Sequence, residues 1–220
     1  PAIGMGDLTV RVDAADSMKL EQFARRHGLT QATVLQGLFA QLLARLSQLD
    51  EIVIGSVRNG RGSQLPGIDT ALGLFIDTLP LRITLPAGMS LVQWLQAQQA
   101  EQAEQDEHAH IGLMGIQSVA GLSGQTLFEA LFVFENYPID DTSGAFGTLR
   151  INDIEVKDGT HYPVALAALP GDTLGLRLSY DKSRLDEQCA ESLLRRLAYL
   201  IKLAPEEGET PISVLSLTQV

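Results

Sequence analysis

The sequence is first notable for what it has little of. It contains one cysteine in 220 residues, so no internal disulfide can form, which fits a reducing, cytoplasmic compartment. It has no run of 18 apolar residues, which excludes a membrane-spanning helix of ordinary length. The opening residues, 1–4, have neither the basic nor the apolar region of a signal peptide. Because the first residue is not methionine, we expect a piece cut from a longer protein.

Basic residues are scarce. Lys and Arg total 16 against 27 Asp and Glu, which gives a formal net charge of −11. A polyanion such as DNA is repelled by this charge, and no long Lys/Arg run offsets it. We therefore expect no nucleic-acid partner.

The common catalytic signatures are also missing. The glycine-rich segment 55–62 follows an expected strand, as phosphate-binding loops do, but it ends in Arg61-Gly62 instead of Gly-Lys-Ser/Thr. It therefore indicates a structural or substrate-channel loop. No Gly-x-Ser-x-Gly elbow occurs, so the serine-hydrolase signature is absent. His108 and His110 stand two residues apart and point to different sides of a helix, so a shared metal is not expected.

Two other groups that could react are better explained by structural roles than by catalysis. Cys189 falls in an amphipathic helix pattern, where a small buried filler is expected rather than a nucleophile. Glu135 lies near Asp140 and Asp141 at a spacing typical of a solvated loop.

The chain nevertheless has what a globular domain needs. Hydrophobic residues make up 45% and charged residues 20%. For this length, scaling rules give burial of roughly 70% of the extended-chain surface, which is ample for a core.

Local patterns predict alternating strands and helices. Asp13, Thr30, Ser90 and Asp186 each stand where a helix N-cap belongs. The helix from 91 to about 108 begins with apolar residues and continues mostly with Gln and Glu, so its second half is expected to be solvated. The strands are expected near 7–13, 51–55, 74–85, 127–134, 148–157, 162–169 and 173–180. We predict an α/β fold, a mixed β-sheet covered by helices.

Several segments together resemble one family. They are VIGSVRNGR (53–61), LPGI (65–68), LGLFIDTLPLR (72–82), EHAHIGLMGIQ (107–117), FEALFVFENYP (128–138), HYP (161–163) and LRLSYD (176–181). In this order they resemble condensation domains of nonribosomal peptide synthetases, across essentially the whole chain. The family's catalytic signature, His-His-x-x-x-Asp-Gly, is absent, because no two histidines are adjacent.

The resemblance implies a single chloramphenicol-acetyltransferase-like lobe. Residues 1–204 would form the C-terminal lobe of a condensation domain, and 205–220 would be a linker toward an adenylation domain. The missing N-terminal lobe would hold the catalytic motif, so no catalytic residue is expected in this segment. The complete domain would join donor and acceptor groups on peptidyl carrier proteins by an amide bond. No cofactor would bind directly, although the phosphopantetheine arms of the carriers would deliver the substrates.

The third matched segment contains the candidates for lining the substrate channel: Gly73, Phe75, Asp77 and Thr78. Gly73 would permit close backbone approach, and Phe75 would pack. Asp77 stands where the family usually has Asn, and an ionised Asp only accepts hydrogen bonds. It would either orient an amine or backbone groups at the channel floor, or merely cap a local turn.

Three further residues, Arg61, Arg82 and His110, are candidates for carrier docking or for a structural role. Two alternatives stay open for the function: a lobe of an epimerization or ester-forming relative, and a docking module without chemistry. An isolated lobe should also expose an apolar flank and self-associate.

Overall fold

The computed structural model describes residues 4–60, 67–135, 145–146, 149–150 and 160–217. Its main sheet has six strands in the order β1-β8-β7-β4-β2-β3. The strands are β1 (Met5–Arg11), β2 (Glu51–Asn59), β3 (Ile76–Thr84), β4 (Ala130–Phe134), β7 (Val164–Leu169) and β8 (Gly175–Asp181). The pairs β2–β4 and β4–β7 are parallel and the others antiparallel, so the mixed sheet predicted from the sequence is confirmed. A separate antiparallel pair is formed by β5 (Ala145–Phe146) and β6 (Leu149–Arg150).

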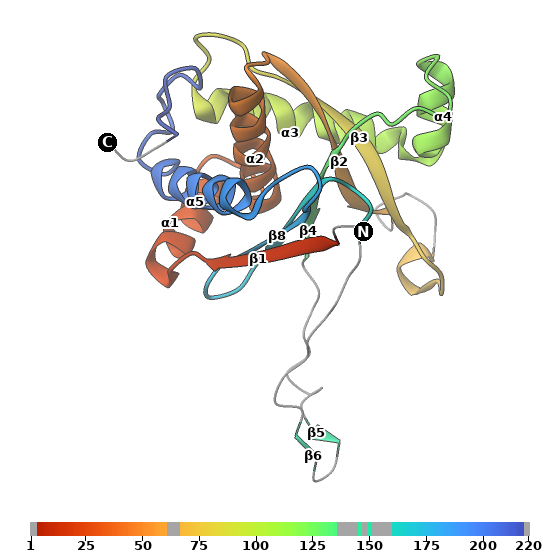
Figure 1. Cartoon of the computed structure of the whole chain (residues 1–220), viewed down its shortest axis with the longest axis horizontal. Helices are drawn as coiled ribbons and strands as arrows, with labels where there is room; N and C mark the ends of the chain where they lie inside the picture. Colours follow the sequence, from red (N-terminus) through yellow and green to blue (C-terminus); the bar gives the residue numbers. More distant parts are fainter. Residues whose placement is uncertain (1–3, 61–66, 136–144, 147–148, 151–159, 218–220) are drawn as a thin grey trace.

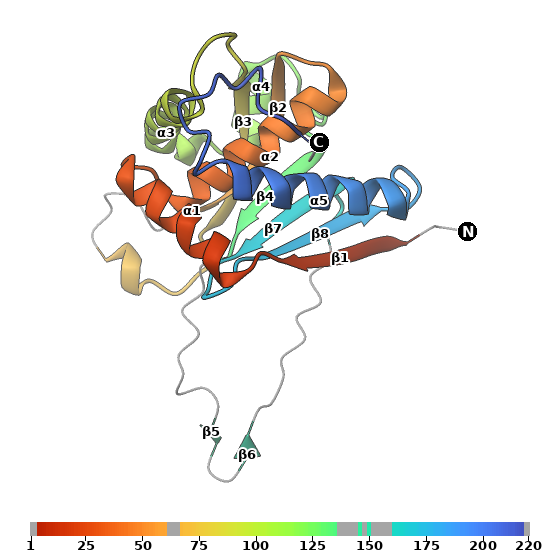
Figure 2. The same ribbon diagram turned by 90° about the vertical axis from the view of Figure 1, so that its left-hand side faces the viewer.

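Several helices cover one face of the main sheet (Figures 1 and 2), whereas Leu113, in the helix over 112–119, packs against the apolar cluster on the other face. The α-helices are α1 (Ala14–Arg26), α2 (Gln31–Ser47), α3 (Leu91–Glu107), α4 (Gly112–Val119) and α5 (Glu187–Leu203). Short 3₁₀ turns lie at η2 (Ile68–Thr70) and η3 (Ala109–Ile111). Figure 2 shows α1, α2 and α5 lying over the strands. The large core lies between this layer and the sheet; its bulkiest fully buried side chains are Trp94, Tyr180, Phe23, Phe39 and Phe132.

The predicted helix starts are confirmed. The side chains of Asp13, Thr30 and Asp186 each accept a hydrogen bond from the backbone N–H three residues on. Ser90 forms a full capping box with Gln93. These caps are local interactions that satisfy otherwise unpaired N–H groups, which explains why sequence alone locates them.

Two local predictions were wrong. β2 runs to Asn59, so the loop expected from Gly55 begins later; pairing with β3 along the full length of β2 extends the strand. The second half of α3 is not wholly solvated, because Gln98 and Gln102 are buried. The strand expected at 148–157 lies mostly outside the described residues.

Residues 205–217, the described part of the segment 205–220 that was expected to be a linker, pack on the rest of the chain. Backbone hydrogen bonds join Leu91 to Thr210 and Ile212 to Met89. The Gln41 amide donates to the Ile212 carbonyl at 2.9 Å, and Ile212 is 1% exposed. The described part of this segment therefore belongs to the hydrophobic core, while a downstream adenylation domain stays a prediction.

Candidate functional site

The two strands that contain the candidate residues have two distinct faces. Alternation places Ile54, Ser56 and Arg58 of β2 on the helix-covered face, where the Ser56 hydroxyl donates to the Gln36 side chain of α2. Val53 and Val57 point to the opposite face, where they pack against a second apolar cluster. Because the register pairs Arg58 with Asp77 and Val57 with Thr78, the two candidates of β3 lie on opposite faces of the sheet.

The ends of β2 and β3 are tied together through Phe75. The N–H of Gly60 donates to the Phe75 carbonyl at 2.7 Å. A Cβ at Gly60 would overlap that carbonyl oxygen, so the close approach requires glycine. A Cβ at Gly73 would lie 3.2 Å from the Phe75 ring, which is also tight. Gly60, Gly73 and Phe75 thus form one compact corner, the β2–β3 corner. Phe75 is half-buried there.

Asp77 is half-buried at the start of β3. Its Oδ1 accepts a hydrogen bond from the Thr78 N–H at 2.8 Å, a local bond of the kind that the turn-cap alternative required. Its register partner across the strand pair is the cation Arg58. The carboxylate, a group that only accepts hydrogen bonds, thus has one donor from its own strand and a positively charged residue at the opposite position.

Arg58 is a charged residue of this region that was not among the sequence candidates. Its Nε lies 3.7 Å from Asp106 Oδ1 near the end of α3, and its side chain is 22% exposed. Within the described residues, Nε is buried and has no hydrogen-bond acceptor. Burial lowers the pKa of the Arg58 guanidinium, and the Asp106 charge only partly opposes this. A cation at an inward position of a strand is unusual, and the strand's alternation would have identified it.

The sheet face away from α1, α2 and α5 contains the second apolar cluster. Its buried members are Phe128, Leu131 and Ala165. The Tyr162 ring stacks on Phe128 with centroids 5.2 Å apart, and His161 lies against Tyr162 at 4.3 Å. Burial raises the pKa of the Tyr162 hydroxyl. The matched segment at 161–163 therefore lies beside the matched segment that begins at Phe128.

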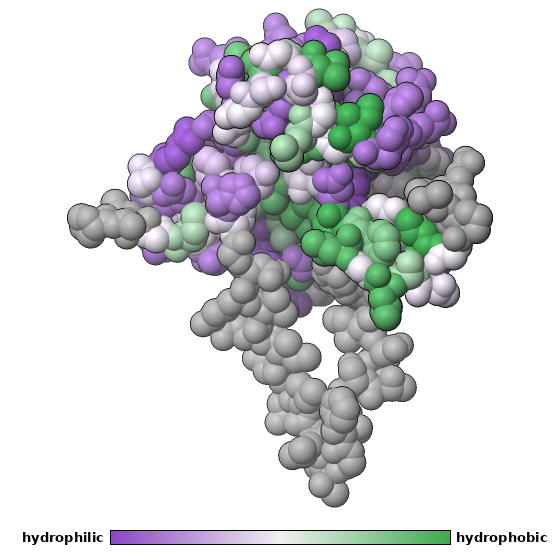
Figure 3. Space-filling view, turned by 90° about the vertical axis from the view of Figure 1, so that its right-hand side faces the viewer, coloured by the Kyte–Doolittle hydropathy of each residue, from purple (hydrophilic) through white to green (hydrophobic). Residues whose placement is uncertain are grey.

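Large apolar side chains are exposed on one side of the lobe. Figure 3 shows hydrophobic surface near η2 and on α4. Leu72 and Leu74 are fully or almost fully exposed just before β3, and Met114 and Val119 are exposed on α4. Large apolar residues are thus exposed on two segments, whereas the prediction that a partner lobe covers them stays a prediction.

The candidates for docking are in different settings. Arg61 lies outside the described residues. Arg82 forms an exposed ion pair with Glu51 at 2.5 Å, which lowers the pKa of the Glu51 carboxyl through the hydrogen bond. His110 is exposed in η3. Arg82 therefore has the strand-end salt bridge that was its structural alternative.

Cys189 and Glu135 were also considered in the sequence, and the structure differs from the expectation for both. Cys189 is exposed, so the expectation of a buried filler was wrong: it lies on the outer side of the first turn of α5. A hydrogen bond to Asp186, and then the charge of Asp186, raise the pKa of the Cys189 thiol. Glu135 pairs with Arg177 at 3.2 Å and is half-buried rather than solvated.

Potential metal ligands are scattered over the described part of the chain. No group of three or more His, Cys, Asp and Glu side chains is placed to hold a metal there. None of the helices among the same residues is both long and apolar enough to cross a membrane.

Comparison with known proteins places the whole chain in one family. Residues 3–219 match the family model described as Condensation domain. The chain is 35% identical over 212 residues to a linear gramicidin synthase of Brevibacillus parabrevis, a match that covers 96% of this chain and 4% of that protein. It is 41% identical over 168 residues to vanchrobactin synthetase VabF of Vibrio anguillarum, covering 74% of this chain and 6% of that protein.

Solved structures agree on the fold. The condensation domain of the Monacolin K polyketide synthase MokA has a TM-score of 0.80 at 18% identity, covering 96% of this chain and 49% of that one. A four-domain nonribosomal peptide synthetase, holo-AB3403, has a TM-score of 0.86 at 20% identity, covering all of this chain and 18% of that one. A complex of the X-domain and OxyB from teicoplanin biosynthesis has a TM-score of 0.80 at 21% identity and is covered over 50% of its chain. The chain thus spans only a small part of the curated relatives, and it belongs to the condensation-domain family of nonribosomal peptide synthetases.

Proposed function

We propose that this chain is the C-terminal lobe of a condensation domain that forms amide bonds between carrier-bound substrates. The observation that carries the proposal is the combination of a family match over residues 3–219 with coverage of only 49% of the MokA condensation domain. Similarity over nearly the whole of this chain to about half of such a domain supports the assignment to one of two lobes.

The chemistry supports a division of labour between the lobes. Attack of an amine on a thioester depends strongly on holding the two groups in alignment, which is worth several orders of magnitude in rate. This lobe would supply one wall of the channel, with Gly73, Phe75 and Asp77 as its candidate lining, whereas the fourth candidate, Thr78, lies on the opposite face of the sheet from Asp77. The partner lobe would supply the His-His-x-x-x-Asp-Gly motif, which this chain lacks. The chain alone is therefore expected to be inactive.

Reconstitution tests this proposal. The chain would be produced alone, joined to an N-terminal lobe with the motif, and joined to the same lobe with the second His of the motif replaced by Ala. Amide formation between loaded donor and acceptor carrier proteins would be followed by mass spectrometry. Product from the intact two-lobe protein only is the expected result. Product from the chain alone would overturn the division of labour.

Asp77 is tested in the two-lobe protein. We expect Asp77→Asn and Asp77→Ala to change the condensation rate while leaving the melting temperature close to that of the parent. Asp172→Asn, in an exposed turn, is the matched control because it removes the same charge elsewhere. Unchanged rates in both Asp77 variants would assign Asp77 to its local bond with Thr78 alone.

A docking module is the second candidate, because the complex of the X-domain and OxyB has this fold. In that case the two-lobe protein would bind a partner enzyme or carrier protein and form no product. Since the chain has a net charge of −11, attraction to an acidic carrier would depend on local apolar and arginine contacts. Retained carrier binding without any amide product would favour this candidate over the first.

A further inference from the structure

A pocket lies far from the β2–β3 corner in the sheet order, where the last residues of β1, the start of α1 and one side of α5 meet. Its volume is about 510 Å³. Ligand sites in proteins commonly have volumes of a few hundred Å³ and more. The pocket is widely open to solvent, and it is large enough for a small organic molecule.

One face of α5 supplies most of the polar wall. Ser192, Arg195, Arg196, Tyr199 and Lys202 all line the pocket. Their spacings of three and four residues place them on one side of the helix. Arg11, the last residue of β1, lines the pocket from the facing side. A helix stripe and a strand end thus bring four cations to one cavity.

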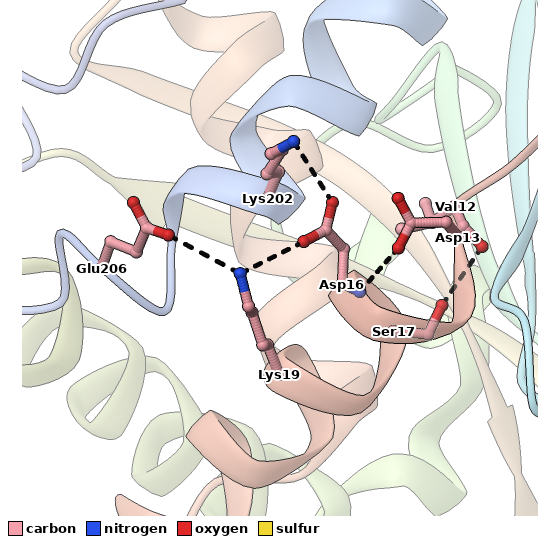
Figure 4. A network of polar contacts seen from close by, with 7 residues as sticks. All are labelled: Val12, Asp13, Asp16, Ser17, Lys19, Lys202 and Glu206. Carbon is pink, nitrogen blue, oxygen red and sulfur yellow. Dashed lines mark hydrogen bonds and ion pairs between the residues drawn. The ribbon is translucent and has the colours of Figure 1, made fainter.

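Asp13 and Asp16, the acidic residues that line the pocket, make contacts with other residues of the protein. Figure 4 shows that Asp13 accepts from the Asp16 N–H as the cap of α1, at 2.8 Å. The Asp16 carboxylate, whose side chain is 10% exposed, lies 3.6 Å from both Lys19 and Lys202. Among the described residues, Asp16 is thus paired with cations, whereas Asp13 makes the cap bond and forms no ion pair, so its negative charge remains in the lining beside four cations.

The three arginines are not neutralised in this way. In the part of the chain that the structure describes, no carboxylate lies within ion-pair distance of Arg11, Arg195 or Arg196. Arg11 makes one long hydrogen bond to Thr173 at 3.4 Å, and Arg196 makes one to Ser192, also at 3.4 Å. In a chain with 27 acidic and 16 basic residues, three unneutralised arginines around one cavity are unexpected.

We propose that this pocket binds a small phosphate monoester. Guanidinium groups match the geometry of a phosphate and bond it in pairs, and its two negative charges balance the lining better than one carboxylate does. The Ser192 and Tyr199 hydroxyls are further donors. Val12, Ala198 and Leu217 give the same cavity an apolar portion, which fits the organic group of an ester. The proposal concerns a site separate from the proposed condensation chemistry and does not rest on it.

Calorimetric titration of the full chain with three probes tests the pocket. Phenyl phosphate presents both the phosphate and an apolar ring, inorganic phosphate presents the phosphate alone, and phenol presents the ring alone. We expect phenyl phosphate to bind about tenfold more tightly than inorganic phosphate, because ring burial adds to the ionic contacts. Phenol should not bind measurably, and added sodium chloride should weaken phenyl phosphate binding.

Substitutions locate the site. Arg195→Gln and Arg196→Gln should each weaken phenyl phosphate binding by about tenfold, the loss expected for one charge-assisted hydrogen bond. Arg26→Gln, at the far end of α1, removes the same charge and should leave the affinity unchanged. Asp16→Asn should strengthen binding, because it removes a negative charge and releases Lys202. Circular dichroism checks that each variant is folded.

Three results would overturn the proposal. The first is no binding of phenyl phosphate at millimolar concentration. The second is equal affinity for phenyl phosphate and inorganic phosphate, which would mean that a bare oxyanion suffices. The third is an equal loss in Arg26→Gln and in the two pocket variants, which would mean that binding responds only to net charge.

Discussion

Arg58 gives the sharpest stability prediction, because its environment does not suit a charge. It is mostly buried on β2, and Asp106, 3.7 Å away, is 52% exposed and easily hydrated without a partner. Replacing a poorly compensated buried ion by an apolar side chain of similar length is often neutral or stabilising. We therefore expect Arg58→Met to leave the free energy of unfolding unchanged or to raise it by up to about 1 kcal/mol.

The magnitude of the ion pair follows from its distance. At 3.7 Å, two unit charges attract by roughly 1 kcal/mol at an effective dielectric constant of about 80 and roughly 2 kcal/mol at about 40. Asp106→Asn removes this attraction and leaves Arg58 unpaired. It also removes a negative charge from the last turn of α3, where the helix dipole disfavours it by about 0.3–1 kcal/mol. The net loss for Asp106→Asn is then between about 0 and about 2 kcal/mol.

A double-mutant cycle separates these contributions. Urea unfolding of the parent, both single variants and the double variant should give a coupling energy of about 1–2 kcal/mol, because the dipole effect cancels. Thermal melts should agree, with about 2–4 °C per kcal/mol for a chain of this size. Arg82→Met is the control: its ion pair with Glu51 is exposed, so the change should stay within about 0.5 kcal/mol. A loss above about 1.5 kcal/mol in Arg58→Met would refute the reasoning, since it would mean that the guanidinium is well bonded.

Three further predictions concern other parts of the lobe. Gly55→Ala should destabilise by about 1–3 kcal/mol in urea unfolding, because its Cβ would overlap the Phe128 ring; Phe128→Leu should recover part of the loss, and no recovery would argue against this contact. Ile212→Ala should cost about 2–4 kcal/mol in the same assay, whereas Ser213→Ala, at the exposed next residue, should cost little; equal small effects would mean that the tail does not contribute to the core. Iodoacetamide should alkylate Cys189 slowly near neutral pH although the thiol is exposed, since Asp186 raises its pKa, and Asp186→Asn should move the pH–rate profile to lower pH; an unchanged profile would contradict the hydrogen bond.

The sequence predicts best what neighbouring residues decide. Helix starts at Asp13, Thr30, Ser90 and Asp186 depend on bonds within one turn, and all four are confirmed. The edge position of β3 was also predictable, because Pro80 cannot donate a hydrogen bond to a second neighbouring strand.

What the sequence could not predict depends on distant partners. The glutamines of α3 form a polar run in the sequence, yet Gln98 and Gln102 become buried once the helix packs on the lobe. Cys189 fits an apolar helix pattern but falls on the outer side of α5. The acidic segment after Pro205 has a linker-like composition, while Ile212 and Leu215 are buried against earlier elements. In each case composition describes the segment correctly, and tertiary contacts decide its exposure.

The two candidate sites also show that tertiary contacts decide which residues come together. The candidates of the β2–β3 corner were chosen from one motif, because Gly73, Phe75 and Asp77 are close in the sequence, but the cation Arg58 comes from another strand and another matched segment, 53–61, where it was not singled out. The pocket beside α5 has no motif, although Arg195, Arg196 and Lys202 repeat at helical spacing. That repeat becomes a site only because β1 brings Arg11 to the same cavity while α1 holds Asp16 against the lysines. Net charge therefore describes this protein poorly at short range: a chain of −11 contains a pocket that is lined by four cations, Arg11, Arg195, Arg196 and Lys202, and by two carboxylates, Asp13 and Asp16.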